Sequence, residues 1–273
     1  MRDRFLNFRT AYSNWRRISK NLMERTMKLW VLFKRGFMTY WYWHVRQLNV
    51  LWPSIMLDGK TLVIYPGVYK PLENEQSCVE YCRDGDRVLD LGCGSGVCAV
   101  FAAGVAREVL AVDISPAAVS NTQENCRHFG RENVTVMHSD MFTNVEGKFN
   151  LILANPPYIE ADFEDNEEQF ATSTKYLPVL FAQVHQYLEK DGRLLVQYPA
   201  WFGGQIKKLA AAHGLDVIKV QRMPRKSLHM SLLSFAYLQV GFRSTLFLIT
   251  PRVVRKSAEA RPVAEQAKPV MAA

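Results

Sequence analysis

Apolar and polar residues follow two distinct patterns along the middle of the chain. Short, mostly apolar runs are typical of buried strands, and they occur at 87–91, 108–113, 133–137, 149–154 and 192–198. Longer amphipathic segments between these runs predict helices at 97–103, 116–129, 176–188 and 205–213. Strands that alternate with helices in this way predict an α/β fold, with a parallel sheet that carries helices on both faces.

Further elements are expected at both ends of this pattern. A short strand at 61–65 and a helix at 77–82 precede the first strand of the main sheet. Three apolar runs near the end of the chain, at 217–220, 232–240 and 245–249, are expected to complete the sheet with an antiparallel hairpin.

Residues 1–35 have a pattern of their own, in which apolar residues recur at alternating three- and four-residue steps from Phe5 to Phe33. This spacing predicts one amphipathic helix, which we expect Gly36 to end. Basic residues surround the apolar stripe, and five of the six tryptophans lie before residue 60. The segment is therefore more than an ordinary solvated leader.

The chain of 273 residues is long enough to bury one substantial core. We divide it into a helical basic and aromatic segment (1–62), an α/β domain (63–250) and a disordered tail (251–273) that is rich in Ala, Pro and charged residues. The net charge is +8, and residues 1–60 contain 12 Lys/Arg against 3 Asp/Glu. The basic character therefore belongs to the ends of the chain.

Three uses of the N-terminal segment are compatible with its residues. It could be a helical lid that packs on the α/β domain and seals the substrate side. It could instead be an interfacial helix on an anionic membrane, or a basic and stacking surface for RNA or another nucleic acid. A membrane span is not expected, because His44, Arg46, Gln47 and Asn49 interrupt any apolar window of the necessary length.

The five cysteines form no framework of the secreted type, and their odd count fits a reducing cytosol. Cys78 and Cys82 are four residues apart, but no paired His/Cys set completes a metal site, so no metal is expected. The start of the chain lacks the uninterrupted apolar core of a secretory signal. We therefore expect a cytoplasmic protein.

Candidate chemistry begins where the first main strand meets three glycines, in Asp90-Leu-Gly-Cys-Gly-Ser-Gly96. A strand, a glycine turn and a helix form the start of a nucleotide-binding unit, in which glycine lets the backbone approach a ligand closely. The next strand ends in Asp113, 17 residues after Gly96. A carboxylate at that strand end is placed to accept hydrogen bonds from both hydroxyls of a ribose.

The third strand is followed by a second acid, Asp140. An acid just past this strand end can accept a hydrogen bond from an adenine amino group, while Met141 or Phe142 lies against the ring. The alternative is an Asp that only forms a turn. The sequence leaves both open.

The fourth strand ends in Asn155-Pro-Pro-Tyr158. Two prolines fix the backbone and remove two donors at the carboxyl edge of the sheet, where ligands bind. The Asn155 side-chain oxygen and the Pro156 carbonyl can both accept N–H bonds from one planar NH2 group, and Tyr158 offers a face for stacking. Amide and aromatic amine nitrogens are poor nucleophiles, so such acceptors would favour the attack of the nitrogen on an activated carbon.

The glycine motif and Ala111-Val-Asp-Ile114 together resemble the cofactor motifs of class I S-adenosylmethionine-dependent methyltransferases. With Asn155-Pro-Pro-Tyr-Ile159 the chain is similar, over about residues 63–200, to the HemK/PrmC-like N-methyltransferases and their small-methyltransferase-domain relatives. The resemblance implies a Rossmann-like, seven-stranded sheet and S-adenosyl-L-methionine as cofactor. It also implies transfer of a methyl group to a planar nitrogen, either a protein glutamine amide or a nucleobase exocyclic amine.

The resemblance also implies roles for individual residues. The catalytic residues would be Asn155, Pro156 and Tyr158. The cofactor-binding residues would be Asp90, Gly92, Cys93, Gly94, Asp113, Ile114, Asp140, Met141 and Asn155. The substrate-binding residues would be Pro157, Tyr158 and Tyr69.

Two departures from the family keep the acceptor open. The loop Gly67-Val-Tyr-Lys-Pro-Leu-Glu-Asn-Glu75 is similar to the tyrosine–proline–acid loop of eukaryotic and archaeal glutamine methyltransferases, but it has Asn74 where an acid is usual. Glu73 in this loop could reach the cofactor or interact with a helix dipole. Residues 167–175 replace the Glu-Pro…Gly-Gly…Asp-Gly-Leu segment of release-factor enzymes. The acceptor could therefore be a nucleobase, another protein amide or a small amine.

Two other functions compete with this interpretation. One is a small-molecule methyltransferase of a biosynthetic pathway, in which the aromatic N-terminal segment closes over a hydrophobic substrate. The other is an RNA- or membrane-bound adaptor with a degenerate methyltransferase fold, against which the intact glycine and Asn-Pro-Pro-Tyr motifs argue. A basic group before the hairpin, Arg222, Arg225, Lys226 and His229, is interpreted as a solvated loop near the substrate entrance.

Overall fold

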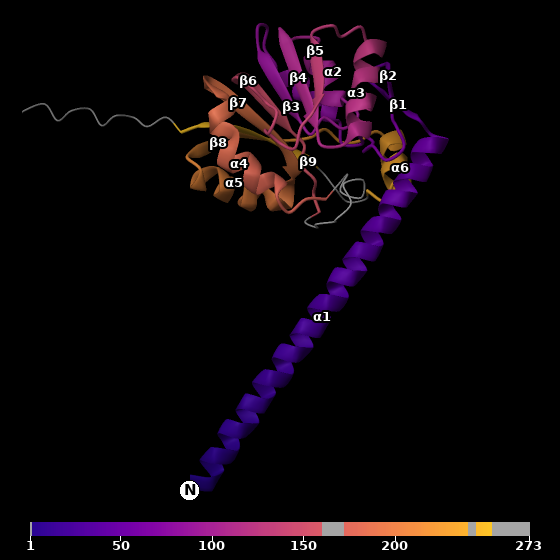
Figure 1. The fold of residues 1–273 in the computed structure, drawn as a ribbon. Coiled ribbons are helices and arrows are strands. Elements are labelled where there is room, and N and C mark those ends of the chain that lie inside the picture. The colour runs from indigo at the N-terminus through magenta and orange to yellow at the C-terminus, as the bar shows by residue number, and fades with distance from the viewer. Residues whose placement is uncertain (1, 160–171, 240–243, 253–273) are drawn as a thin grey trace, which may run out of the picture.

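A computed structural model describes residues 2–159, 172–239 and 244–252 (Figure 1), with side chains described from residue 19 onward except Asn21. A seven-stranded sheet has the order β5-β4-β3-β6-β7-β9-β8. Its strands are β3 (Arg87–Leu91), β4 (Glu108–Asp113), β5 (Val134–His138), β6 (Phe149–Ala154), β7 (Leu188–Pro199), β8 (Leu215–Arg222) and β9 (Ser244–Pro251). The first five of these pair in parallel, and β9 pairs antiparallel with β7 and β8. The predicted seven-stranded α/β fold is confirmed.

Helices cover both faces of the sheet (Figure 1). They are α2 (Val97–Ala102), α3 (Pro116–His128), α4 (Tyr176–Tyr187), α5 (Gly203–Ala212) and α6 (Leu228–Ala236), with short 3-10 helices η1 (Glu75–Tyr81) and η2 (Ala200–Phe202). Buried apolar residues form one cluster on the side of α2 and another on the side of α4 and α5. The helix α3 begins as predicted, because Pro116 is its first residue and the Ser115 side chain accepts a hydrogen bond from the Ala118 amide.

The N-terminal helix is longer than predicted. α1 runs from Arg2 to Leu51, so the expectation that Gly36 ends it was wrong. A glycine inside a helix costs only about 1 kcal/mol, which the packing of the following turns offsets. Met38, Trp41 and Val45 are buried in the core cluster beside α2, whereas the earlier part of α1 projects away from the α/β body (Figure 1).

The run at 232–240 was also assigned wrongly. Its residues up to Ala236 lie in α6, not in a strand, and Val240 is outside the described residues. The Ser227 side chain caps this helix by accepting a hydrogen bond from the Met230 amide. Short apolar runs fit a helix and a strand equally well, and here the Ser227 cap is the local signal that favours the helix.

A small hairpin between α1 and the main sheet was only half predicted. β1 (Ser54–Leu57) pairs antiparallel with β2 (Lys60–Val63) across Asp58-Gly59, whose positive φ angles fit a tight two-residue turn. The strand predicted at 61–65 is β2, which begins one residue earlier and ends two residues earlier than predicted, and β1 was missed. The predicted division of the chain at residue 62 falls inside β2, and it stays a prediction. The predicted tail beyond residue 252 lies outside the described residues.

Candidate active site

A cavity of about 460 Å³ lies where the parallel strands β3, β4, β5 and β6 end. Ligands of α/β proteins bind at this edge of the sheet, and the volume is in the range of small-molecule sites. Each residue to which the resemblance assigns a role lines this one cavity: Tyr69, Asp90, Gly92, Cys93, Gly94, Asp113, Ile114, Asp140, Met141, Asn155, Pro156, Pro157 and Tyr158. The fold thus brings these residues together, while their individual roles stay predictions.

The glycine turn at residues 92–96 leaves space for a ligand beside the backbone at one wall of the cavity. Gly94 has a φ of 55°, and a Cβ added to it would meet no protein atom within 4 Å. Gly96 has a φ of 79°, and a Cβ there would lie 2.8 Å from the Cγ2 atom of Thr122. Gly94 therefore permits a ligand to approach the backbone, whereas Gly96 permits α2 to pack closely on α3.

Asp113, at the end of β4, is held by the backbone around it. Its Oδ2 atom accepts a hydrogen bond from the Gly94 amide at 2.9 Å, and its Oδ1 atom accepts one from the Ser115 amide at 2.9 Å. Each oxygen keeps a second lone pair for a hydroxyl group. Burial raises the pKa of Asp113, while the two amides act in the opposite direction. The geometry fits a ribose.

Asp90 and Asp140 occupy different environments. The Asp90 side chain is 3% exposed, and its Oδ2 atom accepts a hydrogen bond from the Ala99 amide at 2.9 Å. Burial raises the pKa of Asp90 to about 7, so this group is only partly ionised at neutral pH. Asp140 is exposed at the cavity wall, where the Ser139 hydroxyl donates to the Met141 carbonyl at 2.9 Å and shapes the turn.

Met141, and not Phe142, lines the cavity beside Asp140. Phe142 is buried in the core instead, where its ring stacks on Tyr187 with centroids 4.4 Å apart. Of the two residues offered for contact with a planar ring, only Met141 is therefore placed to make it.

The Asn155–Tyr158 turn is braced from within. The Tyr158 hydroxyl donates to the Asn155 Oδ1 atom at 2.8 Å and is 3.1 Å from the Ser244 Oγ atom. The Tyr158 ring also meets Tyr198 edge to face at 5.4 Å. Burial raises the pKa of Tyr158, so its hydroxyl stays neutral and can donate. The Asn155 oxygen is thereby fixed in the cavity wall and keeps one lone pair for a ligand.

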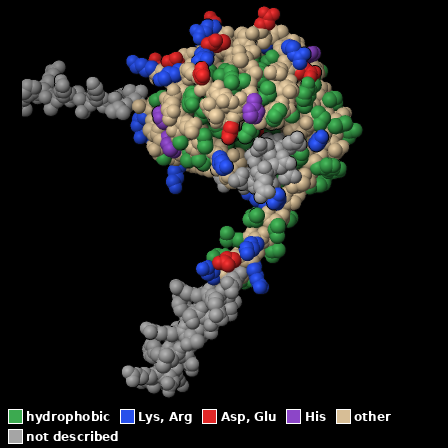
Figure 2. Space-filling model, in the orientation of Figure 1, with side chains coloured by type: hydrophobic (Ala, Val, Ile, Leu, Met, Phe, Trp, Pro, Cys, Tyr) green, Lys and Arg blue, Asp and Glu red, His purple; other side chains and the backbone are tan. Residues whose placement is uncertain are grey.

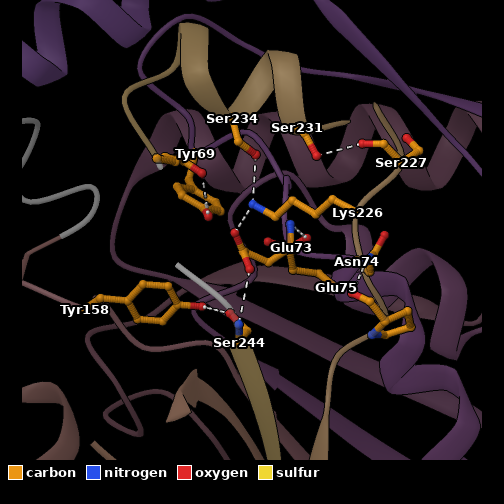
Figure 3. Close-up of polar contacts among 12 residues, drawn as sticks. Tyr69, Glu73, Asn74, Glu75, Tyr158, Lys226, Ser227, Ser231, Ser234 and Ser244 are labelled. Atoms are coloured by element: carbon orange, nitrogen blue, oxygen red, sulfur yellow. Dashed lines mark hydrogen bonds and ion pairs between the residues drawn. The ribbon is translucent and has the colours of Figure 1, made fainter. Parts of the chain in front are cut away.

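A buried ion pair that sequence analysis missed stands beside this turn (Figure 3). The Glu73 carboxylate pairs with the Lys226 ammonium and accepts a hydrogen bond from the Ser244 amide at 3.2 Å. Lys226 also donates to the Ser234 hydroxyl at 2.8 Å. The interpretation of Lys226 as part of a solvated loop was wrong, because its side chain is only 15% exposed. No local signal reveals a pair whose members are 153 residues apart.

Glu75 and Gln239 carry buried polar atoms that have no partner among the described atoms. The Glu75 Oε2 atom accepts a hydrogen bond from the Glu73 amide at 2.9 Å, but its Oε1 atom has none. The Gln239 Oε1 atom accepts from the Tyr69 hydroxyl at 3.2 Å, while its Nε2 atom is unsatisfied. Both side chains line the cavity, and buried polar groups normally have partners, so a ligand is the natural complement.

The charge state of Glu75 follows from its surroundings. Burial, together with the nearby Glu73 carboxylate, raises its pKa to about 8. Glu75 is therefore mostly protonated at neutral pH and can donate a hydrogen bond as well as accept one. Within the described ranges, no group of His, Cys, Asp or Glu residues is arranged to hold a metal ion.

The last turns of α1 close one side of the cavity. Phe37 and Trp41 belong to its lining. The Trp41 indole donates to the Tyr237 carbonyl at 2.8 Å, and the His44 Nε2 atom lies 2.8 Å from the Ala236 carbonyl. The C-terminal part of α1 is therefore part of the site's wall.

Known proteins resemble the α/β part of the chain. A family model described as the methyltransferase small domain matches residues 77–201. A provisionally named protein N5-glutamine methyltransferase from Methanocaldococcus jannaschii is 33% identical over 149 residues, which cover 50% of this chain and 75% of that protein. The release factor glutamine methyltransferase of Escherichia coli is 38% identical over 89 residues, or 32% of each chain. This chain thus matches only about a third of that second relative.

Solved structures share the fold. The ribosomal protein L11 methylase of Lactobacillus delbrueckii subsp. bulgaricus aligns with a TM-score of 0.52 at 21% identity, over 72% of this chain and 89% of its own. A provisionally assigned methyltransferase in complex with SAH aligns with a TM-score of 0.52 at 17% identity, over 72% and 55% of the two chains. Together with the relative from Methanocaldococcus jannaschii, these matches explain why the motif residues meet at one cavity: the chain belongs to the class I S-adenosylmethionine-dependent methyltransferases.

Proposed function

We propose that the protein transfers a methyl group from S-adenosylmethionine to the side-chain amide nitrogen of a glutamine in a protein. The observation that carries this proposal is the braced turn at Asn155, which lines the cavity together with Pro156 and whose amide oxygen is held by the Tyr158 hydroxyl. An amide nitrogen has a delocalised lone pair and attacks poorly. Two fixed acceptors on its N–H bonds favour a pyramidal, reactive nitrogen.

The unsatisfied atoms of Glu75 and Gln239 support an acceptor that carries a carbonyl beside its nitrogen. A carboxamide needs hydrogen-bond donors for its oxygen as well as acceptors for its N–H groups. The Gln239 Nε2 atom and the protonated Glu75 carboxyl are both potential donors in the cavity wall. The names of two relatives, which refer to glutamine methylation, support the same acceptor class.

When bound, S-adenosylmethionine supplies a methyl group on a positively charged sulfur, which is already activated for transfer. The residues of the chain then contribute mainly by position. Asp113 and Gly94 would hold the cofactor's ribose side, and Asn155 would orient the acceptor nitrogen. No strong base is needed before transfer, because the nitrogen becomes acidic only after it has gained the methyl group.

The proposal is tested with isotopically labelled cofactor and a cell lysate that is separated into protein, RNA and small-molecule fractions. We expect label in protein, on glutamine after digestion and mass spectrometry. Label only in RNA or only in small molecules would refute a protein amide as acceptor.

The role of Asn155 is tested with Asn155→Ala on the labelled protein acceptor. We expect turnover to fall by about a hundredfold or more, as when a preorganised hydrogen-bonding group is removed. Cofactor affinity, measured by calorimetry, should change little, which controls for folding. A variant that remains active would remove Asn155 from the orienting role.

A further inference from the structure

The projecting part of α1 carries a continuous apolar stripe that nothing in the described structure covers. Its large side chains are 44% to 66% exposed, and they are Leu22, Met23, Leu29, Trp30, Phe33 and Phe37. Their positions recur at three-, four- and seven-residue intervals, so they share one side of the helix. Figure 2 shows apolar side chains along the described part of the projecting helix. A stripe of this size exposed to water is a contact surface.

The later turns of α1 pack against α6. Trp41 and His44 lie one and two turns beyond Phe37 on the same side of α1, and both contact backbone carbonyls at the end of α6. On α6 itself three apolar residues at helical spacing are exposed to 77%, 63% and 69%: Leu228, Leu232 and Phe235. Exposed apolar residues are therefore present both on the projecting part of α1 and on the helix that packs against its later turns.

Basic residues share the remaining circumference of α1 with Met27, Val31 and Leu32, which are also exposed. The basic residues are Lys20, Arg25, Lys28, Lys34 and Arg35, all at least partly exposed. Glu24 is the single acid among the described side chains of this helix. A helix that exposes a stripe of Leu, Trp and Phe and carries many Lys and Arg beside it has the composition of helices that lie in the headgroup region of a membrane.

We propose that this surface, formed by α1 from residue 20 to 37 and the outer face of α6, binds a membrane rich in anionic lipids. The basic residues complement the negative headgroups, and the apolar stripe enters the hydrocarbon boundary. The helix lies on the bilayer and does not cross it, because no helix in the described part of the chain is long and apolar enough to span one. Phe37 and Leu238 line the cavity and are also exposed, so the surface reaches the active-site wall.

Two other occupants fit less well. A second copy of the helix would bring the same basic residues together, with only Glu24 to compensate, and like charges beside an apolar seam oppose pairing. An RNA would satisfy the basic residues but would leave Leu22, Leu29 and Phe33 in water. A lipid surface offers anionic headgroups to the basic residues and hydrocarbon to the apolar stripe.

Sedimentation of the full chain with vesicles tests the proposal. We expect binding to vesicles of equal parts phosphatidylcholine and phosphatidylglycerol, weaker binding at high salt, and little binding to phosphatidylcholine alone. The double substitution Leu29→Ser/Phe33→Ser should lower partitioning by about a hundredfold, roughly tenfold for each buried side chain. The double substitution Lys28→Glu/Arg35→Glu should abolish the preference for phosphatidylglycerol.

Matched control variants separate this surface from general effects. Ile218→Ser alters an equally exposed apolar residue on β8, and Lys207→Glu/Lys208→Glu makes the same change in net charge on α5. Both controls should bind vesicles as the parent does. All variants should keep their affinity for S-adenosylmethionine, because none of the substituted residues lines the cavity.

Several results would overturn the proposal. Absence of vesicle binding by the full chain is one, and equal binding by Leu29→Ser/Phe33→Ser is another. Light scattering that reveals a dimer disrupted by the same substitutions would assign the stripe to a second copy. Salt-sensitive RNA binding lost in Lys28→Glu/Arg35→Glu, without vesicle binding, would assign it to RNA. None of these results bears on the acceptor, which labelling in solution tests separately.

Discussion

The buried carboxyl of Glu75 permits a quantitative test of the cavity's electrostatics. Glu75→Gln removes the ionisable group and keeps the shape of the side chain. The new amide oxygen can still accept the hydrogen bond from the Glu73 amide that the Glu75 Oε2 atom now accepts. The substitution therefore isolates the free energy of keeping this carboxyl in a 1% exposed position.

The magnitude follows from the pKa of Glu75, which burial raises from 4.5 to about 8. The unfolded chain loses this proton near its usual pKa, whereas the folded protein retains it to about pH 8. The contribution to stability is therefore fully present below the unfolded pKa and is lost as the pH rises toward the folded pKa. At pH 7 the protein has lost about 3 kcal/mol of its free energy of unfolding relative to low pH, at 1.36 kcal/mol for each pKa unit.

We expect Glu75→Gln to be more stable than the parent by about 3 kcal/mol at pH 7 and by little at pH 4. Urea unfolding followed by circular dichroism, without cofactor, measures this difference at both pH values. Glu132→Gln, which changes an exposed carboxyl, should leave the parent's pH dependence unchanged. A stability gain that is the same at both pH values, or a loss at pH 7, would refute the reasoning.

Two further predictions concern the cofactor site and the ion pair. Asp113→Ala should weaken binding of S-adenosylmethionine by about tenfold to a hundredfold, which is the range for lost hydrogen bonds to a charged group. Calorimetry measures this affinity, and an unchanged value would remove Asp113 from the ribose site. Lys226→Met should destabilise the protein by about 3 kcal/mol at pH 7, because it leaves the Glu73 carboxylate, 3% exposed, without its cation. Addition of Glu73→Gln should restore most of this stability in urea unfolding, and if it does not, the unpaired carboxylate is not the cause.

The amino-acid sequence by itself determined the centre of the sheet and the motif residues that line its cavity. β4 and β6 have the predicted bounds, because their apolar runs end at the local signals Asp113 and Asn155-Pro156. The carboxyl ends of parallel strands meet at one edge of the sheet. The motif residues that follow these strands, among them Asp90, Asp113 and Asn155, therefore converge there without help from distant contacts. Local patterns were sufficient there.

Only the tertiary structure decided the features that depend on distant partners. α1 continues through Gly36 because the turns around Trp41 pack on α6 and the core, a gain that no window of the N-terminal sequence contains. The pairing of Glu73 with Lys226 joins residues 153 positions apart. The burial of a polar side chain depends on all such distant contacts together. Burial raises the pKa of Glu75, and it determines which polar atoms of the cavity need a ligand as their hydrogen-bond partner.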